Sequence, residues 1–407
     1  MRTISLATLL LMLGACGQSG NESEAPEDAA ADSSYEEELR LALEYASPGD
    51  VIEVPAGTHA FSRGLTLSVD GVTIRGAGMN ESVLSFAGQV AGAEGLLVNA
   101  SDFTIEDLAI EDTVGDALKV NEGENIVIRR VRAEWTGGPN PDNGAYGVYP
   151  VQTESTLIDG VVAIGASDAG IYVGQSRSVV VRNSRAERNV AGIEIENTVH
   201  ADVHDNVATN NTGGILVFNM PDLPMAGHST RLFDNDVSDN NTSNFGAPGS
   251  AVASVPAGSG IVINANDKVE IFRNRIAGNQ TANVLISSLF SADYSDERET
   301  VADFDPYPES IYLYDNEFGP GGSAPDRDEL EQLRQQMFGA DGSLPDVVWD
   351  GVVNPATTDT GSGICIEDDA SFLDLDAGND YAAPSTDLEP HDCNLAKLDA
   401  VEIAAGR

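Results

Sequence analysis

A short apolar motif of the form G-[IL]-x-[VI] returns about every 22 residues through the middle of the chain. Within each copy, apolar and polar residues alternate, which is typical of a β-strand with one buried face. A second series of short strands follows in phase, so the period leaves no room for a helix. A fixed period of this length predicts a solenoid. The copies lie at 94–99, 116–121, 146–151, 169–174, 191–196, 213–218, 259–264 and 282–287.

Stacked coils of this kind bury their inward residues in one continuous apolar core. We expect Ile171, Ile193, Ile215 and Ile261 to form one inward column, with Tyr172 on the opposite face. Asn recurs at two further coil positions, where an amide can accept from one backbone and donate to the next. A structural role is therefore favoured over a catalytic one for Asn206, Asn235, Asn274, Asn211, Asn240 and Asn279.

These strand series resemble the right-handed parallel β-helix of pectate lyases, polygalacturonases and alginate epimerases. The resemblance covers roughly residues 50–320. It implies an all-β fold, a right-handed parallel β-helix, and leaves the activity open, because one fold carries many functions.

The N-terminal sequence indicates where in the cell the protein is located. Arg2 precedes an apolar run, and Leu-Gly-Ala-Cys at 13–16 resembles the lipobox of bacterial lipoproteins. The resemblance implies that 1–15 is a signal peptide and that Cys16 carries a lipid that anchors the protein to the membrane. By analogy, Gly after the Cys favours the outer membrane, facing the periplasm or the surface. The alternative is an ordinary signal peptide with an incidental Cys.

Changes of composition divide the chain into regions. The segment after Cys16 is small and acidic, which indicates disorder. Ser34 and Glu37 then form a capping-box pattern that predicts a helix closing the first coil. Beyond 320 the period stops, and a second helix is expected at 326–338. We therefore expect an acidic tether over 16–33, a capping helix over 34–46, the β-helix over 47–320 and a C-terminal cap over 321–407.

Three cysteines remain to be placed. With Cys16 acylated, Cys365 and Cys393 are left in an exported chain, and we expect them to form a disulfide. Neither has a CxxC partner, which disfavours a metal pair. His200 and His204 lack the Glu that a zincin needs. The sequence therefore identifies no metal ligands and requires no cofactor, while calcium stays open.

The strongly negative net charge limits the classes of molecule that the protein can bind. Removing 1–15 takes away only Arg2, which leaves 20 Lys and Arg against 66 Asp and Glu. Nucleic acid is excluded, because neutralising phosphates needs a basic face. Polyuronates are disfavoured unless divalent cations bridge the two anions. Adaptation to salt explains such acidity without any function. The Arg residues within 129–188 are expected to form ion pairs between coils, and an anion site is the alternative.

A candidate site follows from four long insertions, at 136–146, 219–229, 243–258 and 288–309, which all flank the motif strand. Long loops between short turns are more often functional than ornamental. Outward residues of neighbouring coils are about 4.8 Å apart and would form a continuous polar and aromatic strip suited to sugar rings. Its candidate catalytic residues are Lys119, Tyr149, Tyr172, Glu194 and Glu196, and its candidate substrate-binding residues are Asn121, Gln152, Phe218 and Asn264.

Glu194 and Glu196 point the same way with Cα atoms about 6.6 Å apart, near the range for a paired acid and base in glycoside hydrolysis. For elimination or epimerisation, Lys119 or a Tyr can abstract the proton beside a carboxylate. The DPHD-type motif of epimerases and the strand Arg of pectate lyases are absent, as is the Asp-rich polygalacturonase signature. A solvated acidic face without catalysis is the competing interpretation.

Two hypotheses follow. One is a β-helix that binds or processes a polysaccharide as a lyase, epimerase or hydrolase. The other is a non-catalytic surface scaffold that acts with a protein partner. The chain also resembles uncharacterised bacterial β-helix lipoproteins, whose genes often neighbour an exported cytochrome-like protein. That resemblance rests on overall layout and implies such a cytochrome-like partner.

Overall fold

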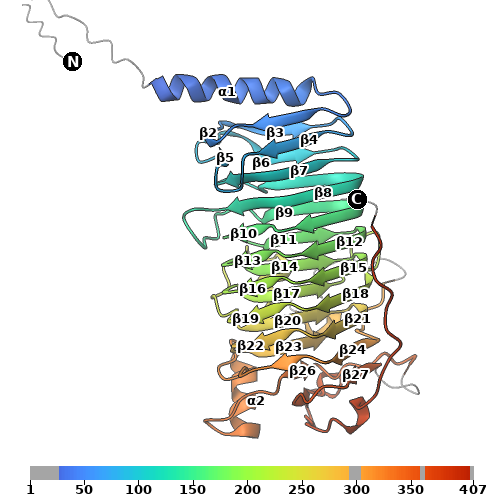
Figure 1. The fold of residues 1–407 in the computed structure, drawn as a ribbon. Helices are drawn as coiled ribbons and strands as arrows, with labels where there is room; N and C mark the ends of the chain where they lie inside the picture. The colour runs from blue at the N-terminus through green and yellow to red at the C-terminus, as the bar shows by residue number, and fades with distance from the viewer. Residues whose placement is uncertain (1–26, 293–303, 358–362, 404–407) are drawn as a thin grey trace, which may run out of the picture.

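The computed structural model describes residues 27–292, 304–357 and 363–403. Through them the chain winds into a right-handed parallel β-helix, as predicted, with three faces of stacked strands along one axis (Figure 1). The predicted signal peptide, Cys16 and most of the predicted tether lie outside the described residues.

Every strand of the coils pairs in parallel with its counterpart one coil away. The first face carries the repeated motif and contains β3 (Arg63–Leu67), β6 (Ala91–Val98), β11 (Ala169–Gly174), β14 (Ala191–Glu196), β17 (Gly213–Phe218), β20 (Ser259–Asn264), β23 (Ala282–Ser287), β26 (Val347–Trp349) and β28 (Phe372–Asp374). The second contains β1 (Val51–Val54), β4 (Thr73–Gly76), β12 (Arg177–Arg182), β15 (Val199–His204), β18 (His228–Phe233), β21 (Asp267–Phe272), β24 (Ile311–Tyr314) and β27 (Ile364–Ile366). The third contains β2 (Gly57–Ala60), β5 (Ser82–Ser85), β10 (Val162–Ile164), β13 (Arg185–Glu187), β16 (Val207–Thr209), β19 (Asp236–Ser238), β22 (Arg275–Ala277) and β25 (Glu317–Phe318). Three longer strands bend around corners and serve more than one face: β7 (Thr104–Glu111), β8 (Leu118–Glu134) and β9 (Tyr146–Asp159).

The predicted inward column is confirmed. Ile171, Ile193, Ile215 and Ile261 are in register on β11, β14, β17 and β20, and all are fully buried. Each such side chain contributes about 1.5 to 3 kcal/mol to folding. The period of the motif therefore follows from the need to keep one apolar column continuous.

The two Asn ladders at the corners are also confirmed as structural. Asn206 Nδ2 donates to Asn235 Oδ1 at 3.0 Å, and Asn235 Nδ2 donates to Asn274 Oδ1 at 2.9 Å. Asn211, Asn240 and Asn279 repeat the arrangement five residues later. Because these side chains are buried, the ladder satisfies polar groups that would otherwise cost free energy.

Ion pairs link neighbouring coils, as predicted for the Arg-rich segment. Arg130 contacts Asp107 at 2.6 Å, and Arg182 contacts Asp159 at 2.9 Å.

Helix α1 (Glu27–Glu44) closes the N-terminal end, where Leu39 and Leu43 are buried against the first coil. Glu36 accepts from the backbone and hydroxyl of Ser62 at 3.0 Å. The helix begins earlier than the expected residue 34, so Ser34 is no N-cap and part of the expected tether is helical. The extra turns are rich in Ala, the best helix former. None of the described helices has the length and apolar character needed to cross a membrane.

The solenoid extends beyond the expected end at 320. Residues 319–346, which include α2 (Asp328–Phe338), are an insertion within a coil, because β26 returns to register with Val347 opposite Val284. The loss of period after 320 therefore marks this insertion, and the coils continue to β28.

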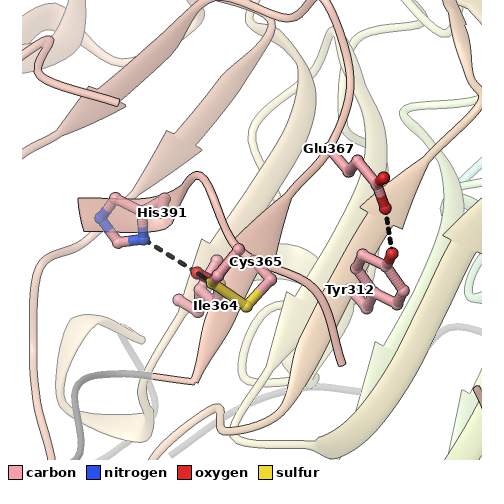
Figure 2. The surroundings of a disulfide bond; sticks show 6 residues. Tyr312, Ile364, Cys365, Glu367 and His391 are labelled. Carbon is pink, nitrogen blue, oxygen red and sulfur yellow. Dashed lines mark hydrogen bonds between the residues drawn. A yellow bond between two sulfur atoms is a disulfide. The ribbon is translucent and has the colours of Figure 1, made fainter. Parts of the chain in front are cut away.

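The predicted disulfide between Cys365 and Cys393 is present (Figure 2). His391 lies beside it with Nδ1 3.0 Å from the Ile364 carbonyl oxygen, and Tyr312 donates to Glu367, which directly follows the neighbouring strand β27. From the disulfide the chain end runs back along the second face (Figure 1). We call residues 393–403 the C-terminal strap. Four short 3₁₀ turns complete the described structure: η1 (Ala251–Ser254), η2 (Leu289–Ser291), η5 (Ala377–Asn379) and η6 (Glu389–His391).

Candidate functional site

The predicted outward column lies on the first face in the expected register. Lys119 is opposite Tyr149 on β8 and β9, and Tyr172 is opposite Glu194 on β11 and β14. The column is not the open strip that the sequence predicts, because Tyr172 and Glu194 are only 4% and 1% exposed. The insertions cover it, and its polar groups therefore face protein and a cavity.

Side-chain amides hold these insertions in place. Asn197 donates to the carbonyls of Met220 and Met225, and Asn219 forms a reciprocal pair of hydrogen bonds with the backbone of Gly227. In the next insertion, Asn244 donates to the carbonyls of Val252 and Val255 at 2.8 and 2.9 Å. Such bonds give the loops defined conformations without regular secondary structure.

The insertions also pack on one another. Met220, Ala251 and Leu289 come from three different insertions and form one buried cluster, with Leu223 and Phe304 against it. We call this arrangement the roof. It covers the strand face beneath it.

Between roof and strand face lies a cavity of about 170 Å³ that is partly open to solvent. Three carboxyl groups border it. Its lining residues are Tyr146, Asp168, Glu194, Glu196, Met220, Leu223, Ser250, Ala251 and Val252.

Glu194 is the central polar group of the cavity. Its Oε2 is buried and has no hydrogen-bond partner. Burial raises the pKa of Glu194 well above its usual value, and the nearby Asp168 and Glu196 raise it further. Burial therefore favours the protonated form of Glu194, the form that can donate a proton.

Asp168 stands just before β11 and is half-buried because it borders the cavity. Burial, followed by the charges of Glu196 and Asp116, raises its pKa to about 8. Burial also raises the pKa of Asp116 to about 6, and Asp116 accepts from the backbone of Tyr146 at 3.3 Å. Like charges in one poorly hydrated site cannot all ionise, so the cluster shares protons near neutral pH.

Glu196 has a different environment. Tyr172 Oη donates to its Oε1 at 2.5 Å, and Gln175 Nε2 lies 3.4 Å from the same oxygen. The cavity thus places two carboxyl groups in different environments. Glu194 Oε2 has no partner, whereas Glu196 Oε1 is held by Tyr172 and Gln175, and two such environments are what acid and base catalysis needs.

Three tyrosines border the acidic groups. The rings of Tyr146 and Tyr172 are 4.6 Å apart, and Tyr149 packs against both. Lys119 Nζ lies 4.7 Å from the centre of the Tyr149 ring. Burial raises the pKa of Tyr149 to about 12 and also raises that of Tyr172 well above its usual value, so neither is suited to act as a base near neutral pH.

The four predicted substrate-binding residues lie outside the cavity lining. Asn121 donates to Asn99 at 3.1 Å, and Gln152 is exposed at a corner with a positive φ of 55°. Phe218 is buried in the apolar cluster beside Val252, and Asn264 donates to Ser287 at 2.9 Å. Asn121 and Asn264 thus contact neighbouring coils, and Phe218 packs against the roof insertion.

Sequence reasoning missed Tyr146, Asp168 and Ser250. Tyr146 and Asp168 border the N-terminal ends of β9 and β11, where the chain enters the first face. Their position in the sequence, at or just before the first residue of a motif copy, could have identified them. Ser250 gave no signal, because its position depends on the path of the 243–258 insertion. In the described ranges no group of three His, Cys, Asp or Glu residues is arranged to hold a metal ion.

Comparison with known proteins agrees with the fold. Residues 67–241 match the family described as right handed beta helix region. The A-module of a mannuronan C-5 epimerase from Azotobacter vinelandii is similar in structure, with a TM-score of 0.50 and 16% identity over 77% of this chain and 89% of that chain. DFA-IIIase from Arthrobacter chlorophenolicus has a TM-score of 0.47 and 10% identity over 81% of this chain and 90% of that chain. No curated protein matches in sequence. At these identities the likeness is one of fold.

Proposed function

We propose that the protein binds and processes a carbohydrate in the cavity beneath the roof by acid and base catalysis. The observation that carries this proposal is the buried, unpartnered Oε2 of Glu194 on the wall of the cavity. A buried polar atom without a partner costs about 1 to 3 kcal/mol. Natural proteins retain such a cost mainly at functional sites.

The proposed roles follow from the two environments. In hydrolysis, protonated Glu194 gives its proton to the leaving glycosidic oxygen, while the Glu196 carboxylate takes a proton from the attacking water. In a lyase, the same carboxylate removes a ring proton and Glu194 protonates the leaving glycosidic oxygen. In an epimerase, the carboxylate removes the proton and Glu194 returns one to the same carbon from the opposite face. Tyr172 holds Glu196 in place, and the tyrosine cluster offers an aromatic wall to a sugar ring.

The test is a panel of polysaccharides and oligosaccharides incubated with the soluble protein, with and without calcium. Release of reducing ends indicates a hydrolase, an unsaturated sugar indicates a lyase, and a changed ring configuration by NMR indicates an epimerase. Glu194→Gln should abolish turnover. Glu124→Gln, at an exposed position on β8, is the matched control and should leave turnover unchanged.

A wild-type protein that neither binds nor converts any glycan would contradict this proposal. The non-catalytic scaffold would then be the better interpretation. It would act with a protein partner, for which the exported cytochrome-like protein remains the prediction from resemblance.

We further propose that the protein is exported and held at the outer membrane by a lipid on Cys16. Support comes from the lipobox-like segment at 13–16 and the acidic segment behind it, which would separate the β-helix from the lipid surface.

A further inference from the structure

Within the part of the chain that the structure describes, the cavity is lined by acidic and neutral polar groups and by no cation. Asp168, Glu194 and Glu196 border it, and its lining residues include neither Lys nor Arg. Lys119 is directed at the Tyr149 ring, outside the lining. A carboxylate carried by a ligand would find no positive partner among the described lining residues and would face like charges.

Two polar atoms on opposite walls of the cavity are the candidate contacts for a ligand. Glu194 Oε2 belongs to the strand face, and Ser250 Oγ belongs to the roof. Both atoms are buried and neither has a hydrogen-bond partner. A hydroxyl can donate and accept, and so can a protonated carboxyl. The pair therefore complements a ligand that carries several hydroxyl groups.

The size of the cavity limits the ligand further. About 170 Å³ is below the roughly 300 to 1,000 Å³ of pockets that hold drug-sized ligands. The space beneath the roof therefore suits a single ring.

We propose that this cavity binds one uncharged sugar ring and excludes uronates, with Glu194 and Ser250 as the two contacts that determine this specificity. The inference rests on the proposed carbohydrate function and names its substrate class. Elimination and C5 epimerisation both require a carboxyl group on the ring beside the abstracted proton. Exclusion of uronates therefore leaves hydrolysis as the reaction at this site.

The experiment compares matched glycans by calorimetry. β-1,4-linked mannose oligomers and β-1,4-linked mannuronate oligomers of equal length differ only at C6, and a wider array of neutral and uronate glycans covers other linkages. We expect every bound glycan to be neutral and its uronate counterpart to bind at least 10-fold more weakly.

Substitutions at both residues test the named contacts. Ser250→Ala should weaken binding of the neutral glycan about 5- to 10-fold, whereas Ser243→Ala, exposed on the same insertion, should not change it. Glu194→Gln keeps a neutral group that donates and accepts, so the preference for neutral glycans should persist, whereas Glu194→Ala removes the contact and should weaken binding of the neutral glycan about 5- to 10-fold.

The outcomes separate the two proposals. A uronate that binds as tightly as its neutral counterpart overturns the specificity and leaves a carbohydrate site in place. Unchanged binding in Ser250→Ala also overturns the inference. Failure of every glycan to bind overturns the carbohydrate function itself.

Discussion

The ring of Tyr172 lies directly over Gly174, so closely that a Cβ at 174 would come within 2.4 Å of the Tyr172 Cε1 atom. Only Gly allows the ring to lie along the strand and its hydroxyl to reach Glu196 on the next coil. In the motif copy at 169–174, Tyr172 can therefore reach Glu196 only because the residue two positions later is Gly.

We expect Gly174→Ala to displace Tyr172 and break its hydrogen bond to Glu196. Forcing a methyl group into this packing should destabilise the fold by about 1 to 3 kcal/mol. Thermal unfolding measures the loss. Gly88→Ala is the control, because a Cβ there meets nothing within 4 Å. Equal melting temperatures for the two variants would contradict the contact.

The fold was predictable because its signal is local and repeated. Alternation placed Ile171 inward and Tyr172 outward, and the period set the register of the coils. The site was predictable only in part. Outward direction could be inferred for Glu194, but its burial depends on amide contacts such as those of Asn197 and Asn244 within irregular loops, which no periodicity encodes.

The Asn ladder offers a test of the corners. Asn235 accepts from both the backbone and the side chain of Asn206, and donates to Asn274. Asn235→Ala leaves a buried N–H of Asn206 without a partner, which should cost about 1 to 3 kcal/mol. Chemical denaturation measures it. Asn140→Ala, in an exposed loop, should change stability far less.

The protonation of Asp168 predicts a pH dependence of stability. Its pKa is raised from 3.8 to about 8, so folding favours the protonated form. This contribution is complete below about pH 4 and is lost as the pH rises through about 8. The melting temperature of Asp168→Asn should therefore rise relative to that of the wild type as the pH increases from 4 to 8.

Melting curves of both proteins across that range provide the measurement. Asp142→Asn, at an exposed position, is the control and should keep a constant difference from wild type. A constant difference for Asp168→Asn as well would show that Asp168 is ionised in the folded protein.

The lipid anchor has a direct test. Cys16→Ser removes the thiol that acylation requires, so the protein should move from the membrane fraction to the soluble periplasmic fraction. Mass spectrometry of the wild-type N-terminus should find the diacylated Cys16. An unchanged membrane fraction in the variant would contradict the lipobox interpretation, whatever the state of the β-helix.

The C-terminal strap makes the last prediction. Lys397 lies 4.0 Å from the centre of the Tyr314 ring, and the backbone of Leu398 and Val401 donates to Glu270 and Asp202. Beyond these contacts, Val401 and Ile403 pack against apolar side chains of the second face. The disulfide joins the base of this strap to β27.

Replacing Cys365 and Cys393 by Ala should therefore lower the free energy of unfolding by about 3 to 4 kcal/mol, according to the entropic account of a closed loop. Hydrogen exchange should rise first in 393–403, because this segment has no strand partner. Reducing the disulfide of the wild-type protein should reproduce both effects. The backbone amide of Asn206, within its ladder, should stay protected from exchange. Unchanged exchange in the strap after reduction would mean that its contacts with Glu270, Asp202 and Tyr314 hold it without the disulfide.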